Sequence, residues 1–234
     1  LLHDPNLNVR TQALLYLARG GGFDPLDRIQ ELGDFADFSI RAAMVAFLAS
    51  AGPARNEEAA RLMLEQMAGS REPRDRIEAA RVLGIMQDPP VEVITALIQD
   101  ENTDVAAQAM STAHSVGASS AVAALTTSLV TGLFEAGAPL RHRLISALNK
   151  LRQRNPRMEL DVDLIELLLA AEIAGHYRSY QVLAPLDPAD AGQAKVIAAL
   201  RQTMEAELER IFRLIALLAP AASLHDAYVG VRSS

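Results

Sequence analysis

The sequence predicts an all-α protein in which helical hairpins stack on one another. Apolar residues make up 50% of the 234 residues, aromatic residues only 4%, and alternating runs of β-branched residues are scarce, which favours helices over strands. In addition, one apolar frame recurs along the chain at intervals of 30 to 35 residues. A unit of this length fits a pair of helices, and such a pair buries its apolar faces only against neighbouring units.

The recurring frame is a residue pair followed by apolar residues three, four and seven positions after its second member. In the first copy the pair is Val9-Arg10, and the apolar residues are Ala13, Leu14 and Leu17. This spacing places the apolar side chains on one stripe of a helix. The second member of the pair is, in order, Arg10, Arg41, Arg76, Ala106 and Arg141, at intervals of 31, 35, 30 and 35 residues.

A second amphipathic pattern follows several copies of the frame and predicts the second helix of each hairpin. Its clearest segments are residues 56–69, 90–100 and 120–133. Clusters of turn-forming residues separate the expected helices. These clusters lie at 20–22, 51–55, 88–90, 117–120 and 136–139.

The regular interval is lost after Pro156, so we divide the chain into repeats over 1–157 and a helical extension over 158–234. Residues 160–186 predict two apolar helices interrupted near Gly175. Asp187 and Pro188 predict the start of a long helix that ends at Leu218, because aspartate caps helices and proline favours their first position. A last short helix is expected over 223–230.

The pattern D-x(4)-V-R-x-x-A-L-x-x-L, at residues 4–17, resembles the HEAT repeat, particularly the short bacterial type also found in phycobilisome lyases. This resemblance covers roughly residues 1–157. It implies an α-α superhelix, a HEAT-like α-solenoid of about five helical-hairpin repeats, which the C-terminal extension would continue.

The same resemblance implies a structural role for the recurring arginine. In such repeats the arginine of the first helix and a nearby aspartate bond between successive units and hold their stacking angle. The residues at these positions are Arg10, Arg41, Arg76, Arg141, Asp4 and Asp100. The fourth unit has Ala106 in place of the arginine, so we expect a looser junction there.

A second resemblance concerns the C-terminal end. The segments ELERIFRLIALLAP (207–220) and AYVGVRS (227–233) are similar to the soluble HEAT region of bacterial membrane proteins related to ATP:ADP antiporters, which are nucleotide translocases of the major-facilitator type. Ala219 and Val229 depart from the pattern of that family. The resemblance implies a module on the cytoplasmic side, tethered to the inner membrane in the full-length protein.

No pattern for reaction chemistry stands out, so we expect no enzyme activity, cofactor or metal site. The chain has no cysteine, and its five histidines form no H-E-x-x-H motif. Glu172 and His176, four residues apart, are interpreted as a partly buried polar pair rather than part of a metal or catalytic site. Met63 and Met67 are interpreted as core residues.

The formal charge of −7 argues against a general nucleic-acid binder. Residues 141–157 nevertheless contain six arginines and lysines and no acidic residue. A solvated face, balanced by the acidic residues at 159–163, is one interpretation; docking to an acidic protein partner or an anionic membrane surface is the other. The residues of this candidate docking face are Arg143, Lys150, Arg154 and Arg157.

These observations favour a non-catalytic interaction or regulatory module. Because the chain begins with Leu1 in the middle of a pattern, we expect it to be a piece of a longer polypeptide, the translocase-like transporter. Its most apolar segments, 164–175 and 211–222, are shorter than the roughly 20 residues of a membrane span.

Protein partners along the stack are expected, and the membrane domain of the same polypeptide is one candidate. The alternatives are a free-standing scaffold for complex assembly and a phycobilisome-lyase-like protein.

Overall fold

The computed structural model describes residues 4–19, 38–51, 54–86 and 88–219, and within these ranges the protein consists of ten helices and no strand. The all-α prediction is therefore confirmed for the described residues. None of the helices in these ranges is both long enough and apolar enough to cross a membrane. The helices are α1 (Leu7–Arg19), α3 (Phe38–Ala51), α4 (Ala54–Ala68), α5 (Pro73–Leu83), α6 (Val91–Ile98), α7 (Thr103–Ser115), α8 (Ser119–Glu135), α9 (Ala138–Arg154), α10 (Val162–Leu183) and α11 (Ala191–Leu218).

The recurring frame corresponds to a fixed position in the helices. Helices α1, α3, α5, α7 and α9 all begin three residues before the second member of the residue pair, which is therefore the fourth residue of each helix. The second helices expected over 56–69, 90–100 and 120–133 are α4, α6 and α8, within a few residues at each end. The period in the sequence is thus a period of helix starts.

Three of these helix starts share the same turn. The carboxylate of Asp4 accepts a hydrogen bond from the backbone N–H of Asn6 at 2.8 Å, and Asp100 accepts one from Asn102 at the same distance. Ser70, five residues before the frame like these two aspartates, accepts one from Glu72 at 3.2 Å. A short polar side chain that binds the N–H two residues on stabilises the turn before a helix. This explains why the position carries Asp or Ser in these three units.

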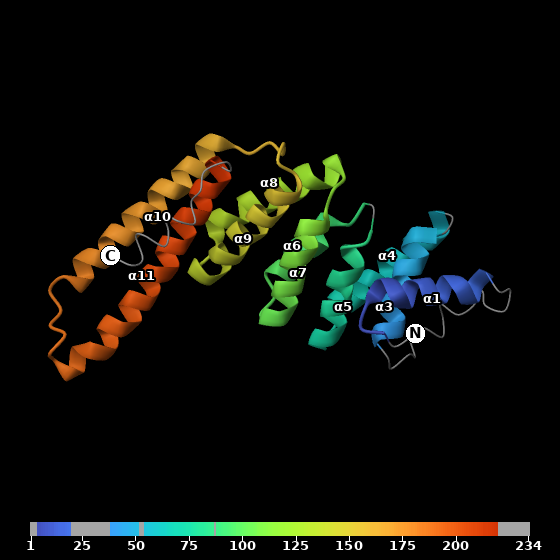
Figure 1. Ribbon diagram of the computed structural model, residues 1–234, viewed down its shortest axis with the longest axis horizontal. Helices are drawn as coiled ribbons and strands as arrows, with labels where there is room; N and C mark the ends of the chain where they lie inside the picture. The colour runs from blue at the N-terminus through green and yellow to red at the C-terminus, as the bar shows by residue number, and fades with distance from the viewer. Residues whose placement is uncertain (1–3, 20–37, 52–53, 87, 220–234) are drawn as a thin grey trace.

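The helices pack in two rows (Figure 1). In the first row each helix contacts the next, from α1 through α3, α5, α7 and α9 to α11. In the second row α4 contacts α6, and α6 contacts α8. Helix α10 differs, because it packs along α11 and makes no extended contact with α8 among the described residues. The regular neighbour contacts of the second row therefore end at α8.

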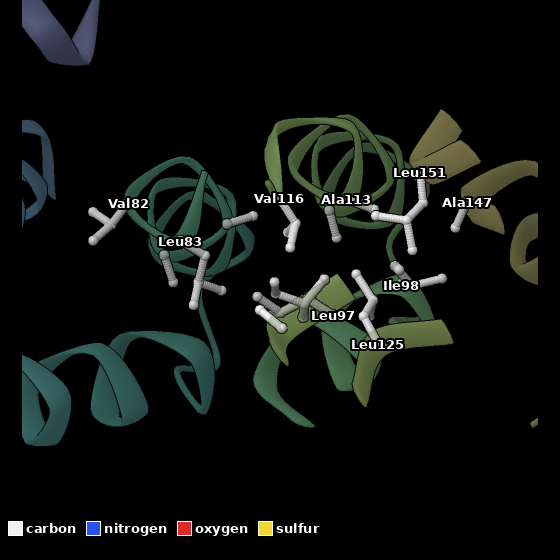
Figure 2. Packing of buried hydrophobic residues seen from close by; sticks show 14 of the residues in the cluster. Val82, Leu83, Leu97, Ile98, Ala113, Val116, Leu125, Ala147 and Leu151 are labelled. Atoms are coloured by element: carbon white, nitrogen blue, oxygen red, sulfur yellow. The ribbon is translucent and has the colours of Figure 1, made fainter. Parts of the chain in front are cut away.

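The apolar core lies between the two rows. Figure 2 shows Ala113, Val116 and Leu151 of the first row pointing toward Leu97 and Leu125 of the second. All five side chains are at most 3% exposed. Because Ala and Leu dominate these positions and aromatic side chains do not, neighbouring helices approach closely with few large side chains between them.

The C-terminal part differs from the prediction in two places. Helix α10 runs through Gly175 without a break, since side chains on both sides of that glycine bond to neighbouring helices. Helix α11 starts at Ala191 and ends at Leu218, as expected for its end. Asp190 rather than Asp187 caps it, and its carboxylate accepts from the N–H of Gly192 at 2.7 Å. The helix expected over 223–230 lies outside the described residues.

Candidate interaction surface

Arg76 joins two consecutive hairpins. Its guanidinium donates to both carboxylate oxygens of Asp100, at 2.6 and 3.0 Å, and to the backbone carbonyl of Ser70 at 2.8 Å. Arg76 lies in α5, whereas Asp100 lies in the turn before α7. The hydrogen bond from Arg76 is the main reason why the pKa of Asp100 lies below its usual value, and the bond in turn raises the pKa of Arg76. The pair is therefore ionised at neutral pH and fixes α5 to the following turn.

Arg141 occupies the equivalent position of α9 but has a different partner. It donates to the backbone carbonyl of Ala136, in the turn before its own helix, and to the carboxylate of Glu172 in α10 at 2.6 Å. Arg210 of α11 donates to the other oxygen of Glu172 at 2.9 Å. The side chains of Glu172 and Arg210 are only 4% and 6% exposed. One buried carboxylate therefore joins three helices.

The first arginine of the proposed ladder reaches further than the next hairpin. Arg10 is 2% exposed and donates to Glu78 of α5 at 2.8 Å, while α3 and α4 form the hairpin between them. Glu78 also accepts from Arg81. Asp4 bonds to the turn before α1, as described above. The side chain of Arg41 lies outside the described residues, and Ala106 is buried without a polar group.

Arg143, expected on the outer side of α9, is partly buried instead. Its guanidinium donates to the backbone carbonyl of Asp100 at 2.7 Å, and its charge also helps to lower the pKa of the Asp100 carboxyl. The turn at Asp100 thus binds one arginine from α5 and one from α9. Helical periodicity could not reveal this, because the bond depends on the position of a turn 43 residues earlier in the chain.

The other basic residues expected in this face lie at the C-terminal end of α9 and just beyond it. Lys150 is partly buried, and its backbone carbonyl accepts a hydrogen bond from Nδ1 of His114 at 3.0 Å. Arg154 and Arg157 are exposed. Arg154 lies in the last turn of α9, where a cation interacts favourably with the helix dipole. The four residues therefore do not form one outward face; only Arg154 and Arg157 project into solvent.

Next to Arg157 lies a hollow of about 500 Å³ between α8 and the segment that follows α9. Its lining includes Val122, Ala123 and Thr126 of α8 and Pro156, Arg157 and Met158 of the segment. The sequence analysis missed this hollow, because the two walls come from segments about 30 residues apart and no local pattern links them. It is mainly apolar, with one exposed guanidinium at its edge.

The segment that walls the hollow is held by hydrogen bonds. Asn155 donates from Nδ2 to the backbone carbonyls of Val116 and Leu151, at 2.9 and 3.0 Å. The backbone N–H of Met158 donates to the carbonyl of Asn155 at 3.0 Å. A preformed wall reduces the ordering entropy that a ligand would otherwise have to overcome.

The Glu172 and His176 pair of the sequence analysis is divided between two contacts. Glu172 bonds to the two arginines described above, whereas Nδ1 of His176 lies 3.0 Å from the carboxylate of Glu207 in α11. Ser179 donates to the same carboxylate at 3.0 Å. No group of three or more histidines, aspartates or glutamates is placed to hold a metal ion in the part of the chain that the structure describes. Met67 is buried and Met63 packs against the core.

Comparisons with known proteins return no similarity. No family model matches the chain, and no curated protein and no solved structure matches it.

Proposed function

We propose that this protein is a non-catalytic interaction module built as a HEAT-like α-solenoid, with about five helical-hairpin repeats and a C-terminal helical extension. The carrying observation is the repeated placement of one residue position: the fourth residue of α1, α5 and α9 is an arginine that bonds to a carboxylate of another hairpin. A stack of this kind presents long surfaces to protein partners and places no demand on reaction chemistry.

In this proposal the module regulates or anchors a bacterial ATP:ADP translocase-like transporter from the cytoplasmic side of the inner membrane. The support is the similarity of residues 207–220 and 227–233 to that family. Arg210 lies in the first of these segments, and its hydrogen bond to Glu172 joins α11 to α10. The partner would be the membrane domain of the same polypeptide.

The complete coding sequence provides the first test. About a dozen apolar spans upstream of the repeats are expected, and a reading frame without them contradicts the transporter role. A frame that contains only repeats would favour the free-standing scaffold.

The second test measures binding between the separately produced membrane domain and this chain. The double variant Arg154→Glu/Arg157→Glu is expected to weaken co-purification, because it reverses two exposed charges, and Arg201→Glu, an exposed arginine of α11, is the matched control. Equal binding by all three proteins would show that Arg154 and Arg157 belong to a solvated face and not to a docking surface.

A further inference from the structure

The second row of helices ends at α8, one flank of which has no neighbouring second-row helix among the described residues. Helix α6 lies on one side of α8, as the contact between the hydroxyls of Thr95 and Ser128 at 3.0 Å shows. Ala123 and Phe134 lie on the opposite side, because 100° per residue separates them from Ser128 by at least a third of a turn, while Val130 between them is buried at 6% exposed. Ala123 is exposed and Phe134 is 48% exposed.

The hollow beside Ala123 lies on the same flank. In the α4–α6–α8 succession each second-row helix has a neighbour on this side, but α10 packs along α11 and not along α8. Figure 1 shows α10 beside α11 and displaced from α8. The hollow of about 500 Å³ lies beside the N-terminal half of α8. Continued packing of the second row would place another helix there.

We propose that this flank of α8 binds one amphipathic helix of a protein partner, which takes the next place in the second row. The proposal rests on the function proposed above and identifies the surface through which the module would bind.

The shape and chemistry of the flank set the properties of that helix. Since α8 has 17 residues, the matching helix needs roughly 12 to 17 residues, which corresponds to about 18–25 Å at 1.5 Å per residue. Its apolar stripe would contact Ala123 and Phe134, with aliphatic side chains entering the hollow against Met158. Pairs of apolar side chains at helical spacing are the usual anchors of such complexes.

Charge at the rim makes the requirement more specific. Arg157 is exposed and Glu159 lies on the same rim. An acidic residue of the partner opposite Arg157 would be favoured, whereas a second acidic residue opposite Glu159 would be repelled. We therefore expect a bound helix with an aliphatic stripe and one acidic and one basic residue beside it.

The test uses a displayed library of 16-residue amphipathic peptides selected on the whole chain. Binding of the enriched peptides is then measured by fluorescence anisotropy for wild type, Ala123→Glu and Ala124→Glu. The two alanines are adjacent and both exposed, but only Ala123 lines the hollow. We expect at least tenfold weaker binding with Ala123→Glu and a change of less than twofold with Ala124→Glu, at equal thermal stability of the two variants.

Charge reversal supplies the second measurement. Arg157→Glu is expected to weaken the peptides that carry an acidic residue and to strengthen versions in which that residue is replaced by lysine. Selection that yields no peptide of micromolar affinity overturns the proposal, as does equal binding to the two alanine variants. A tenfold rise in peptide binding on deletion of residues 220–234 also overturns the proposal. Such a rise would mean that these residues cover the flank in the intact chain.

These outcomes are separable from failure of the proposed function. Peptides that bind but are insensitive to Ala123→Glu refute the α8 flank and leave the interaction role in place. A coding sequence without a membrane domain refutes the transporter role and leaves the helix-binding flank in place.

Discussion

The same arginine position is used differently in α5, which pairs with α6, and in α9, which precedes the C-terminal hairpin of α10 and α11. Arg76 bonds to Asp100 at a partly exposed site, where the two side chains are 17% and 10% exposed. Arg141 bonds to Glu172, which is almost fully buried and also holds the buried Arg210. The first arrangement joins neighbours of a regular row, whereas the second attaches α10 and α11, a pair that departs from the row.

This difference indicates how a row of successively packed helices can end in a pair that packs differently. A turn with an aspartate can recur at more than one helix start because its geometry is local, as the equivalent turns at Asp4 and Asp100 show. The C-terminal hairpin makes no extended contact between α10 and α8 among the described residues, so a larger share of its attachment depends on α11 and on the charged side chains around Glu172. Substitution of Glu172 should therefore lower the free energy of unfolding more than substitution of Asp100.

The largest expected effect is that of Glu172→Ala. It leaves Arg210 buried without its carboxylate, and removal of one partner of a buried ion pair costs about 3–5 kcal/mol. The free energy of unfolding from urea titration measures the loss, and faster amide exchange in α10 and α11 than in α5 would localise it. Glu166→Ala, an exposed glutamate of the same helix, is the control, with an expected change within about 0.5 kcal/mol.

Asp100→Asn should have a smaller effect, of about 2 kcal/mol, at a site in partial contact with water. The amide offers Arg76 one uncharged acceptor oxygen in place of two carboxylate oxygens, so one of the two bonds is lost and the other is weakened. Chemical denaturation of this variant and of Glu172→Ala compares the two regions directly. A larger loss for Asp100→Asn would reverse the order that burial predicts.

The same pair predicts a pH dependence. Arg76 depresses the pKa of Asp100, so the unfolded chain binds this proton more readily than the folded one, and the stabilisation is complete above the usual aspartate value of about 3.9. It is lost as the pH falls through the lower folded value. Thermal unfolding of wild type between pH 2 and 5 should therefore be steeper in pH than that of Asp100→Asn; parallel curves would show that the pair contributes nothing to acid stability.

The smallest expected effect is a gain. A methyl group at Gly175 meets no atom within 4 Å, and alanine is favoured over glycine inside a helix by about 0.8–1.0 kcal/mol. Gly175→Ala should raise the stability of α10 by up to about 1 kcal/mol, seen as slower amide exchange in α10. Gly84, the C-cap of α5, is the comparison site. An added methyl group there would contact Thr112 and Ser115 at 3.5 and 3.7 Å, whereas the one at Gly175 contacts nothing.

Much of the helical architecture could be predicted from the sequence. The interval of the arginine frame located five helix starts, and the apolar stripes located the core residues of α7 and α9, such as Ala113 and Leu148. These features are local, because they depend on helical periodicity and on turn-forming residues. The bonding role of the recurring arginine was implied by the resemblance to HEAT repeats, whereas most of the carboxylates that accept its hydrogen bonds could not be predicted.

Tertiary structure alone decided which charges meet. Glu78 and Glu172 are the carboxylates that receive Arg10 and Arg141, although no spacing distinguishes them from other glutamates. Gly175 remains inside a helix because contacts of α10 with α11 outweigh the low helix propensity of glycine. Arg143 turned inward since a carbonyl at Asp100 lay within its reach. The hollow beside α8 likewise follows from the displacement of α10. Periodicity fixes which face of a helix is apolar, but it contains no information about which distant segment will meet that face.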